Sequence, residues 1–248
     1  MNRNFRIRIS CLRHSVAVCC ATLIFIGCNS QDGIIWDEMQ RAEINGVELA
    51  IYDHGTGEPV VFIHGASGDE VAAVLRETAL ADRYRLIHFH RRGYGFSERP
   101  ESFVTIEQDA ADARAVMEYL GINKAHFVGQ SAGGRVLLQV LRDFPSTVHS
   151  AALLEPPLRS VLEESESSQT LWAAIATASS LHEAGDDAGA VETFFIEVCG
   201  EDFREIFDRT MPKGWFDRSI AEVNWSFSHS QPAWSFTDED AKQFSLPY

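Results

Sequence analysis

Four apolar runs between residues 59 and 157 constrain the fold of this chain more than any other feature of its sequence. They are PVVFIHG (59–65), YRLIHFH (84–90), KAHFVGQ (124–130) and VHSAALLEPP (148–157), and segments with helical spacing separate them. Short continuous apolar runs are typical of strands that are buried on both faces. Strands that alternate with helices form a parallel sheet with helices on both faces. The sequence therefore predicts an α/β fold with a predominantly parallel sheet.

The remaining segments predict how the chain is organised around that sheet. AEINGVELAIYDHG (42–55) indicates two short strands joined at Asn45-Gly46, and Thr105 with Gln108 predicts a capping box for a helix over 106–121. From residue 158 the chain is helical in spacing and rich in aromatic side chains, which predicts a helical lid whose aromatics pack mainly against the sheet. We expect these divisions: a signal peptide (1–27), a tether (28–41), the α/β core (42–157), the lid (158–240) and the start of a further core segment (241–248).

The first 28 residues resemble an export signal. Four arginines and no acidic residue precede SVAVCCATLIFIG (15–27), an uncharged run too short to span a bilayer as a helix. FIGC (25–28) is similar to the bacterial lipoprotein signal, which implies lipidation of Cys28 and attachment to a membrane through that lipid. An ordinary cleaved signal or an uncleaved anchor remains the alternative. We therefore expect an exported protein, anchored by lipid or else periplasmic or secreted. Cys199 would be the one cysteine of its body after Cys28, so no disulfide framework is expected.

The charge of the chain argues against some classes of partner. Its formal net charge is −15, although the first 27 residues are basic. An acidic body does not favour nucleic acid or an anionic membrane surface as a partner. No spacing typical of metal ligands, such as H-x-x-x-H or C-x-x-C, occurs in the sequence. We expect neither a metal nor a cofactor.

Ser131 is the strongest candidate for a catalytic residue. It stands in Gly129-Gln130-Ser131-Ala132-Gly133, between a predicted strand and a predicted helix. This G-x-S-x-G pattern forces the serine into a strained turn that exposes its hydroxyl, and bulkier side chains two residues away would collide. The Ala132 N–H can then stabilise an oxyanion, and the loop after His64-Gly65 supplies the Ala66 N–H as a second donor. His64 itself is expected to brace that loop.

The four apolar runs, with RRGYGFS (91–97) and the serine motif, resemble the α/β-hydrolase fold, in particular its lidded, esterase-like branch. The resemblance implies a small-molecule acyl substrate and an attacking Ser131, with a histidine as general base and an acid that orients it. It also implies that the loop 92–97 is scaffold near the pocket rim. A nucleophilic carboxylate, as in haloalkane dehalogenases or epoxide hydrolases, is disfavoured because serine holds the position.

The partners of Ser131 are harder to find. In this fold the acid and then the histidine follow the lid, and Pro247-Tyr248 looks like the first step of the next strand. We therefore expect the last strands, the acid and the base to lie beyond residue 248, and the present chain to be poorly active. Glu155 is the best substitute acid. His149, His182 and His229 are the histidines after Ser131, and none is a strong candidate for the base.

The expected function is hydrolysis of an ester or related acyl bond through an acyl-enzyme on Ser131. Two alternatives remain open. One is a catalytically inactive binding protein on the same fold. The other is a cofactor-free perhydrolase or a hydrolase of carbon–carbon bonds.

Overall fold

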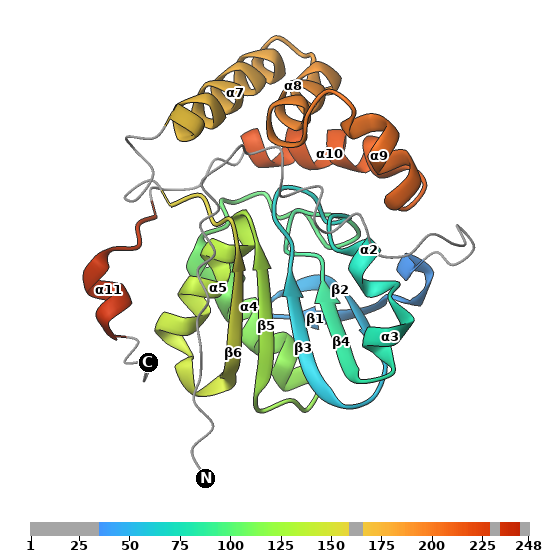
Figure 1. Cartoon of the computed structure of the whole chain (residues 1–248), viewed down its shortest axis with the longest axis vertical. Helices are drawn as coiled ribbons and strands as arrows, with labels where there is room; N and C mark the ends of the chain where they lie inside the picture. The colour runs from blue at the N-terminus through green and yellow to red at the C-terminus, as the bar shows by residue number, and fades with distance from the viewer. Residues whose placement is uncertain (1–34, 159–165, 229–233, 244–248) are drawn as a thin grey trace.

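A computed structural model describes residues 35–158, 166–228 and 234–243. Six strands form one sheet in the order β1-β2-β4-β3-β5-β6, in which β4, β3, β5 and β6 run parallel and β1 and β2 are antiparallel to their neighbours (Figure 1). The strands are β1 (Gln40–Ile44), β2 (Val47–His54), β3 (Glu58–Ile63), β4 (Tyr84–Phe89), β5 (Ala125–Gln130) and β6 (Val148–Leu154). The predicted α/β fold with a mostly parallel sheet is confirmed.

Two local predictions are also confirmed. Asn45 and Gly46 join β1 to β2 with φ of 51° and 75°, the left-handed pair that a tight hairpin turn requires. Thr105 accepts a hydrogen bond from the Gln108 N–H, and the Gln108 side chain accepts one from the Thr105 N–H. This capping box starts α4 (Ile106–Tyr119).

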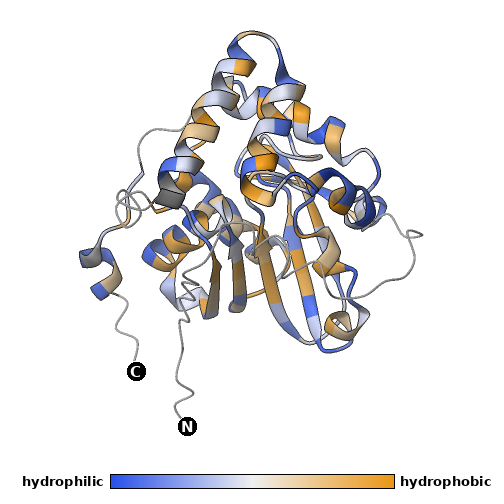
Figure 2. Cartoon of the chain, turned by 45° about the horizontal axis from the view of Figure 1, so that its top comes forward, coloured by the Kyte–Doolittle hydropathy of each residue, from blue (hydrophilic) through white to orange (hydrophobic). Residues whose placement is uncertain are grey.

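Helices cover both faces of the sheet. On one face, α4 and α5 (Ala132–Asp143) pack against alternate strand residues such as Val61 and Ile63. Phe62 points to the other face, where it packs with the region of α2 (Ala72–Leu75). This division explains why β3 is apolar at successive positions. The strands are among the most hydrophobic parts of the chain in Figure 2.

The segment 69–84, which has helical spacing, forms two short helices and not one. They are α2 and α3 (Thr78–Ala81), and the chain between them turns at Glu77, whose φ and ψ of −70° and 100° are extended. Two short 3-10 helices, η2 (Ile35–Glu38) and η3 (Pro145–Thr147), precede β1 and β6.

Four helices lie across the carboxyl ends of the parallel strands, and we call them the lid (Figure 1). They are α7 (Glu166–Glu183), α8 (Asp187–Cys199), α9 (Phe203–Thr210) and α10 (Trp215–Ser228). Phe195, Phe203, Phe207 and Trp215 form a buried aromatic cluster between three of them. The sequence predicts that the lid aromatics pack mainly against the sheet, whereas this group packs lid helices against one another.

The last described helix, α11 (Asp238–Gln243), lies beside the sheet and away from the lid (Figure 1). Trp234 and Phe236, which precede it, pack against the core near α5. The predicted strand start at Pro247 lies outside the described residues. None of the helices in the described ranges has the length and hydropathy to cross a membrane.

Candidate active site

Ser131 occupies a strained turn between β5 and α5. Its φ and ψ are 48° and −121°, a conformation that costs a non-glycine residue roughly 1–3 kcal/mol. The turn is fixed by two backbone hydrogen bonds: the Ser131 N–H donates to the Leu154 carbonyl, and the Gly134 N–H donates to the Ser131 carbonyl, both at 2.8 Å. The geometry is that expected of an exposed serine at a strand-to-helix turn.

The glycines around Ser131 are required by close backbone approaches. A Cβ at Gly133 would lie 2.2 Å from the Ile63 carbonyl oxygen, and one at Gly129 would lie 2.7 Å from the Gly133 carbonyl oxygen. The collision predicted from the sequence for the two glycines of the motif is therefore present. Gly65 is equally crowded, because its Cβ would lie 2.9 Å from the Ser131 Cβ.

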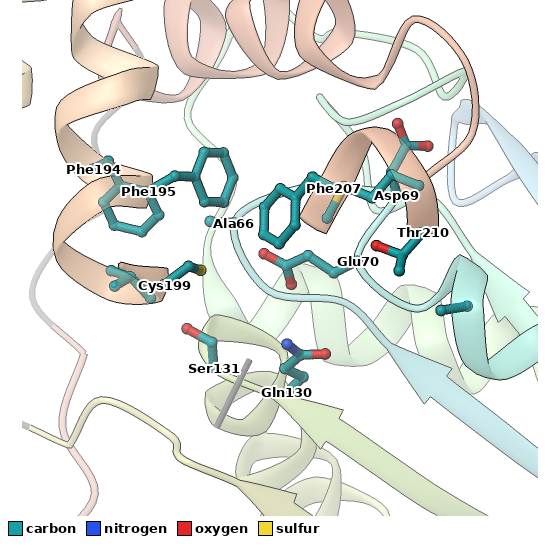
Figure 3. Close-up of a pocket in the computed structure, with 13 residues that line it drawn as sticks. Ala66, Asp69, Glu70, Gln130, Ser131, Phe194, Phe195, Cys199, Phe207 and Thr210 are labelled. Atoms are coloured by element: carbon teal, nitrogen blue, oxygen red, sulfur yellow. The ribbon is translucent and has the colours of Figure 1, made fainter. Parts of the chain in front are cut away.

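A pocket of about 670 Å³, counted to its open mouth, lies over Ser131 between the sheet and the lid. Its floor includes Ala66, Gln130 and Ser131, and helices α8 and α9 supply an apolar roof (Figure 3). The lining residues from the lid are Phe194, Phe195, Val198, Cys199, Phe207, Thr210 and Met211.

One of the two predicted oxyanion donors lines this pocket, and the other directly follows Ser131. Ala66 lines it, and Ala132 is the first residue of α5, directly after Ser131. The first amides of a helix have no partner within the helix, and the helix dipole favours negative charge at that end. The role of these two amides as oxyanion donors stays a prediction.

Glu70 is a pocket residue that the sequence analysis did not single out. Its Oε2 accepts a hydrogen bond from the Gly65 N–H at 2.8 Å, and its Oε1 accepts one from the Ser67 N–H at 3.0 Å. Burial raises the pKa of the Glu70 carboxyl to about 7, although these amides and the Arg91 charge oppose the shift. In Figure 3 the carboxyl group and the Ser131 side chain face the same space.

Three buried histidines, His64, His88 and His90, pack against one another. His64 Nε2 accepts from the Arg91 N–H at 3.0 Å, so its Nδ1 carries the proton that faces the Gly65 carbonyl oxygen at 3.2 Å. His64 braces the loop, as expected. Burial lowers the pKa of His64 and of its neighbour His90, and lowers that of His88 to about 4. These side chains are neutral at physiological pH.

The other polar candidates lie apart from the pocket. His149 is exposed at the start of β6, the opposite end of the sheet, and stacks on His126. His182 in α7 contacts Asp187 at 2.5 Å. Glu155 is exposed after β6. None of these three is among the pocket-lining residues, and His229 and Cys28 lie outside the described residues.

Helix α10 connects the lid to the loops that follow β3 and β4. Glu222, which is 1% exposed, accepts hydrogen bonds from the Gly95 N–H at 2.8 Å and the Gly68 N–H at 3.2 Å. Arg218 forms an ion pair with Asp69 at 2.7 Å. Burial raises the pKa of Glu222 to about 7, and the nearby Asp69 carboxyl adds to the shift. Hydrogen bonds and an ion pair from α10 thus hold the lid against the loops beside the pocket.

The residues that the structure describes contain no cluster of three or more histidine, cysteine or acidic side chains suited to a metal ion. The arrangement at the pocket includes a strained serine and the partly buried Glu70 carboxyl, which is held by backbone amides.

A comparison of the sequence with family models decides the family. The model described as alpha/beta hydrolase fold matches residues 58–178, from β3 into α7. The chain belongs to the α/β-hydrolase fold superfamily.

Solved structures of other α/β hydrolases agree with this assignment. A meta-cleavage product hydrolase is 25% identical with a TM-score of 0.53, over 84% of this chain and 76% of that one. A thermophilic esterase from Thermogutta terrifontis is 23% identical with a TM-score of 0.56, over 75% of this chain and 72% of that one. The second likeness concerns the fold alone.

Curated relatives match this α/β hydrolase in sequence over less than half of its length. The dihydrolipoyllysine-residue acetyltransferase component of the acetoin cleaving system of Cupriavidus necator is 36% identical over 118 residues, which are 47% of this chain and 32% of that protein. A Mycobacterium tuberculosis relative is matched over 42% of its length. The chain thus spans less than half the length of these curated relatives.

Proposed function

We propose that this α/β hydrolase cleaves an ester or related acyl bond of a small molecule through an acyl-enzyme on Ser131. The observation that carries the proposal is the backbone of Ser131, which is held at φ 48° on the floor of a pocket. A strained non-glycine residue at such a place is a mark of function. The crowded glycines on both sides keep its hydroxyl at the pocket.

The proposed step begins with attack of the Ser131 Oγ on the substrate carbonyl carbon. The carbonyl electron pair moves onto its oxygen, which the Ala66 and Ala132 N–H groups would stabilise. The serine proton passes to a base and then to the leaving group, and water later releases the acid. Among the described residues no histidine lines the pocket, and we assign no base.

A fluorophosphonate probe tests the proposal, because it forms a covalent bond with an activated serine and releases fluoride. We expect slow labelling at Ser131, because no histidine among the described residues lines the pocket, and no labelling of the S131A variant. Ser150, whose hydroxyl contacts His126 Nδ1 at 2.7 Å near the opposite end of the sheet, offers the control: S150A should label like wild type. Equal labelling of S131A and wild type would remove Ser131 as the nucleophile.

A second candidate is hydrolysis of an acyl carbon–carbon bond by the same serine. The likeness to a meta-cleavage product hydrolase favours it. Turnover of a meta-cleavage product with none of simple aryl esters would select this candidate over ester hydrolysis.

We further propose export and lipid attachment at Cys28, supported by the arginine-bearing start and the apolar run before FIGC. Metabolic labelling with a fatty acid should mark the protein, and C28S should abolish the label. Labelling that persists in C28S would contradict this attachment site.

A further inference from the structure

Glu70 is a partly buried carboxyl that lines the pocket, and the proposed serine mechanism leaves it without a role. Both of its oxygens are fixed by backbone amides of one short loop, Gly65 on Oε2 and Ser67 on Oε1. The Ala66 amide also interacts favourably with the ionised carboxyl. The Glu70 carboxyl therefore contacts the loop whose Ala66 amide is expected to donate to an oxyanion.

Glu70 and Ser131 are neighbours across Gly65. A Cβ at Gly65 would lie 2.7 Å from the Glu70 Oε2 and 2.9 Å from the Ser131 Cβ. Because Gly65 has no side chain, the Glu70 carboxyl and the Ser131 side chain can both approach the space beside its Cα. Figure 3 shows the carboxyl turned toward the space above Ser131. An acyl group bonded to Ser131 would occupy the pocket that Glu70 also lines.

The chemistry of the carboxyl depends on its proton. An ionised carboxylate only accepts hydrogen bonds, whereas a neutral carboxyl has one O–H donor and retains an acceptor. The Gly65, Ser67 and Ala66 amides occupy acceptor positions of the carboxyl, so a proton on Glu70 takes a remaining position of a group that lines the pocket. A carboxylic acid kept neutral by its surroundings can donate to an oxyanion.

We propose that Glu70 is a further catalytic residue of this site: its neutral carboxyl donates a hydrogen bond to the acyl oxygen at Ser131, and its ionised form opposes the oxyanion. This inference rests on the proposed function of Ser131. The ionised Glu70 carboxylate opposes the oxyanion in two ways. It repels the negative charge of the oxyanion, and it accepts the Ala66 N–H that the oxyanion would otherwise accept. The partly buried position of Glu70 is consistent with a group that is neutral over part of the physiological range, because burial raises its pKa to about 7.

Other charged groups near Glu70 have partners of their own. The Arg91 guanidinium is paired with Asp109 at 2.6 Å and donates to the Gly65 carbonyl oxygen at 2.7 Å. Asp69, the adjacent carboxyl, is paired with Arg218 of α10. His64 below the loop is held neutral by burial, which lowers its pKa.

On the other sides of the pocket the titratable groups are few. The lid residues at the pocket contribute the Cys199 thiol from α8, whereas Phe207 and Thr210 of α9 do not titrate there. Gln130 and Ser131 close the floor. Glu70 is consequently the one carboxyl among the pocket-lining residues besides the ion-paired Asp69.

Amide NMR shifts of the full chain test the geometry without any reaction. The Gly65 and Ser67 amides should titrate together near pH 7 in wild type and lose this transition in E70Q. Glu222 provides a matched control, because burial also raises its pKa to about 7 and it holds the Gly68 and Gly95 amides. E222Q should remove the transition of that second pair alone. A Gly65 and Ser67 transition that survives in E70Q would overturn the proposal.

The rate of fluorophosphonate labelling tests the catalytic role. The ratio of the wild-type rate to the E70Q rate should fall as pH rises through 7, because the amide side chain of the E70Q variant keeps an N–H donor and never ionises. E70A, without a donor, should label about 10²-fold more slowly than wild type at pH 6, the scale of losing one oxyanion donor. A constant ratio across pH, or E70A as fast as wild type at pH 6, would overturn the role.

Failure of the proposed function would look different. Labelling that is absent from wild type and from every Glu70 variant, or unchanged in S131A, refutes Ser131 as nucleophile and with it the donor role of Glu70. Labelling that depends on Ser131 but not on Glu70 refutes only the inference. A circular dichroism spectrum of each variant identifies any that fails to fold, and E70Q keeps the test decisive if E70A is one of them.

Discussion

Replacing Asp112 by alanine should destabilise the fold more than any change to an exposed ion pair. Asp112 is fully buried in α4, and its two oxygens accept from Arg92 Nε at 2.6 Å and Nη2 at 2.7 Å. Asn45 Nδ2, from the hairpin turn, also donates to Asp112 at 3.0 Å. D112A would leave the Arg92 guanidinium, which is 7% exposed, buried without its counter-charge.

The magnitude follows from that burial. Removing one partner of a buried ion pair costs roughly 3–5 kcal/mol, mostly because the remaining charge is left uncompensated. We expect the free energy of unfolding of D112A to fall by this amount. For a chain of this size 1 kcal/mol corresponds to a shift of about 2–4 °C in the unfolding midpoint. The midpoint should therefore fall by roughly 6–20 °C.

Urea unfolding followed by circular dichroism measures the change, with two control variants. E48A breaks the exposed pair of Glu48 with Arg41, which has the same 2.6 Å separation but side chains 48% and 54% exposed, and should cost no more than about 1 kcal/mol. The double variant R92M/D112L should recover most of the loss, since a hydrophobic pair can replace a buried ion pair. The reasoning is refuted if D112A costs no more than E48A, or if the double variant is as unstable as D112A.

Three further predictions concern stability. G133A should lower the free energy of unfolding by at least about 2 kcal/mol, because its Cβ would overlap the Ile63 backbone; a neutral result in urea unfolding would show that the turn can relax. Burial raises the pKa of Glu222 in the folded protein to about 7, against an ordinary value of 4.5. The free energy of unfolding of wild type should therefore fall as the pH rises from about 4.5 through 7, whereas the E222Q side chain does not ionise. Between pH 5 and pH 8, E222Q should gain on the order of 3 kcal/mol of stability relative to wild type. The T105A variant should lose about 1 kcal/mol of thermal stability with its capping box, and an unchanged midpoint would argue against that role.

Much of the fold could be predicted because its signals are local. Successive apolar residues in β3 reflect burial on both faces, and Asn45-Gly46 specifies a turn that few other pairs can adopt. The strained serine turn was predictable for the same reason, since the strand, the glycines and the helix that form it are contiguous. The break at Glu77 was not, because helical spacing continues across it.

The environment of the serine was decided only in three dimensions. Glu70 follows Ser67 by three residues and looks like an ordinary acidic residue of a helix start. It lines a pocket whose other residues include Phe195 and Phe207, more than a hundred residues later in the chain. Glu222 carries no sequence signal for its contact with Gly68, which lies 154 residues away. Sequence by itself determined where the nucleophile candidate stands, because neighbouring residues shape its backbone. Tertiary structure decided which carboxyls are buried beside it, because desolvation and hydrogen bonding to distant amides arise only when the chain packs.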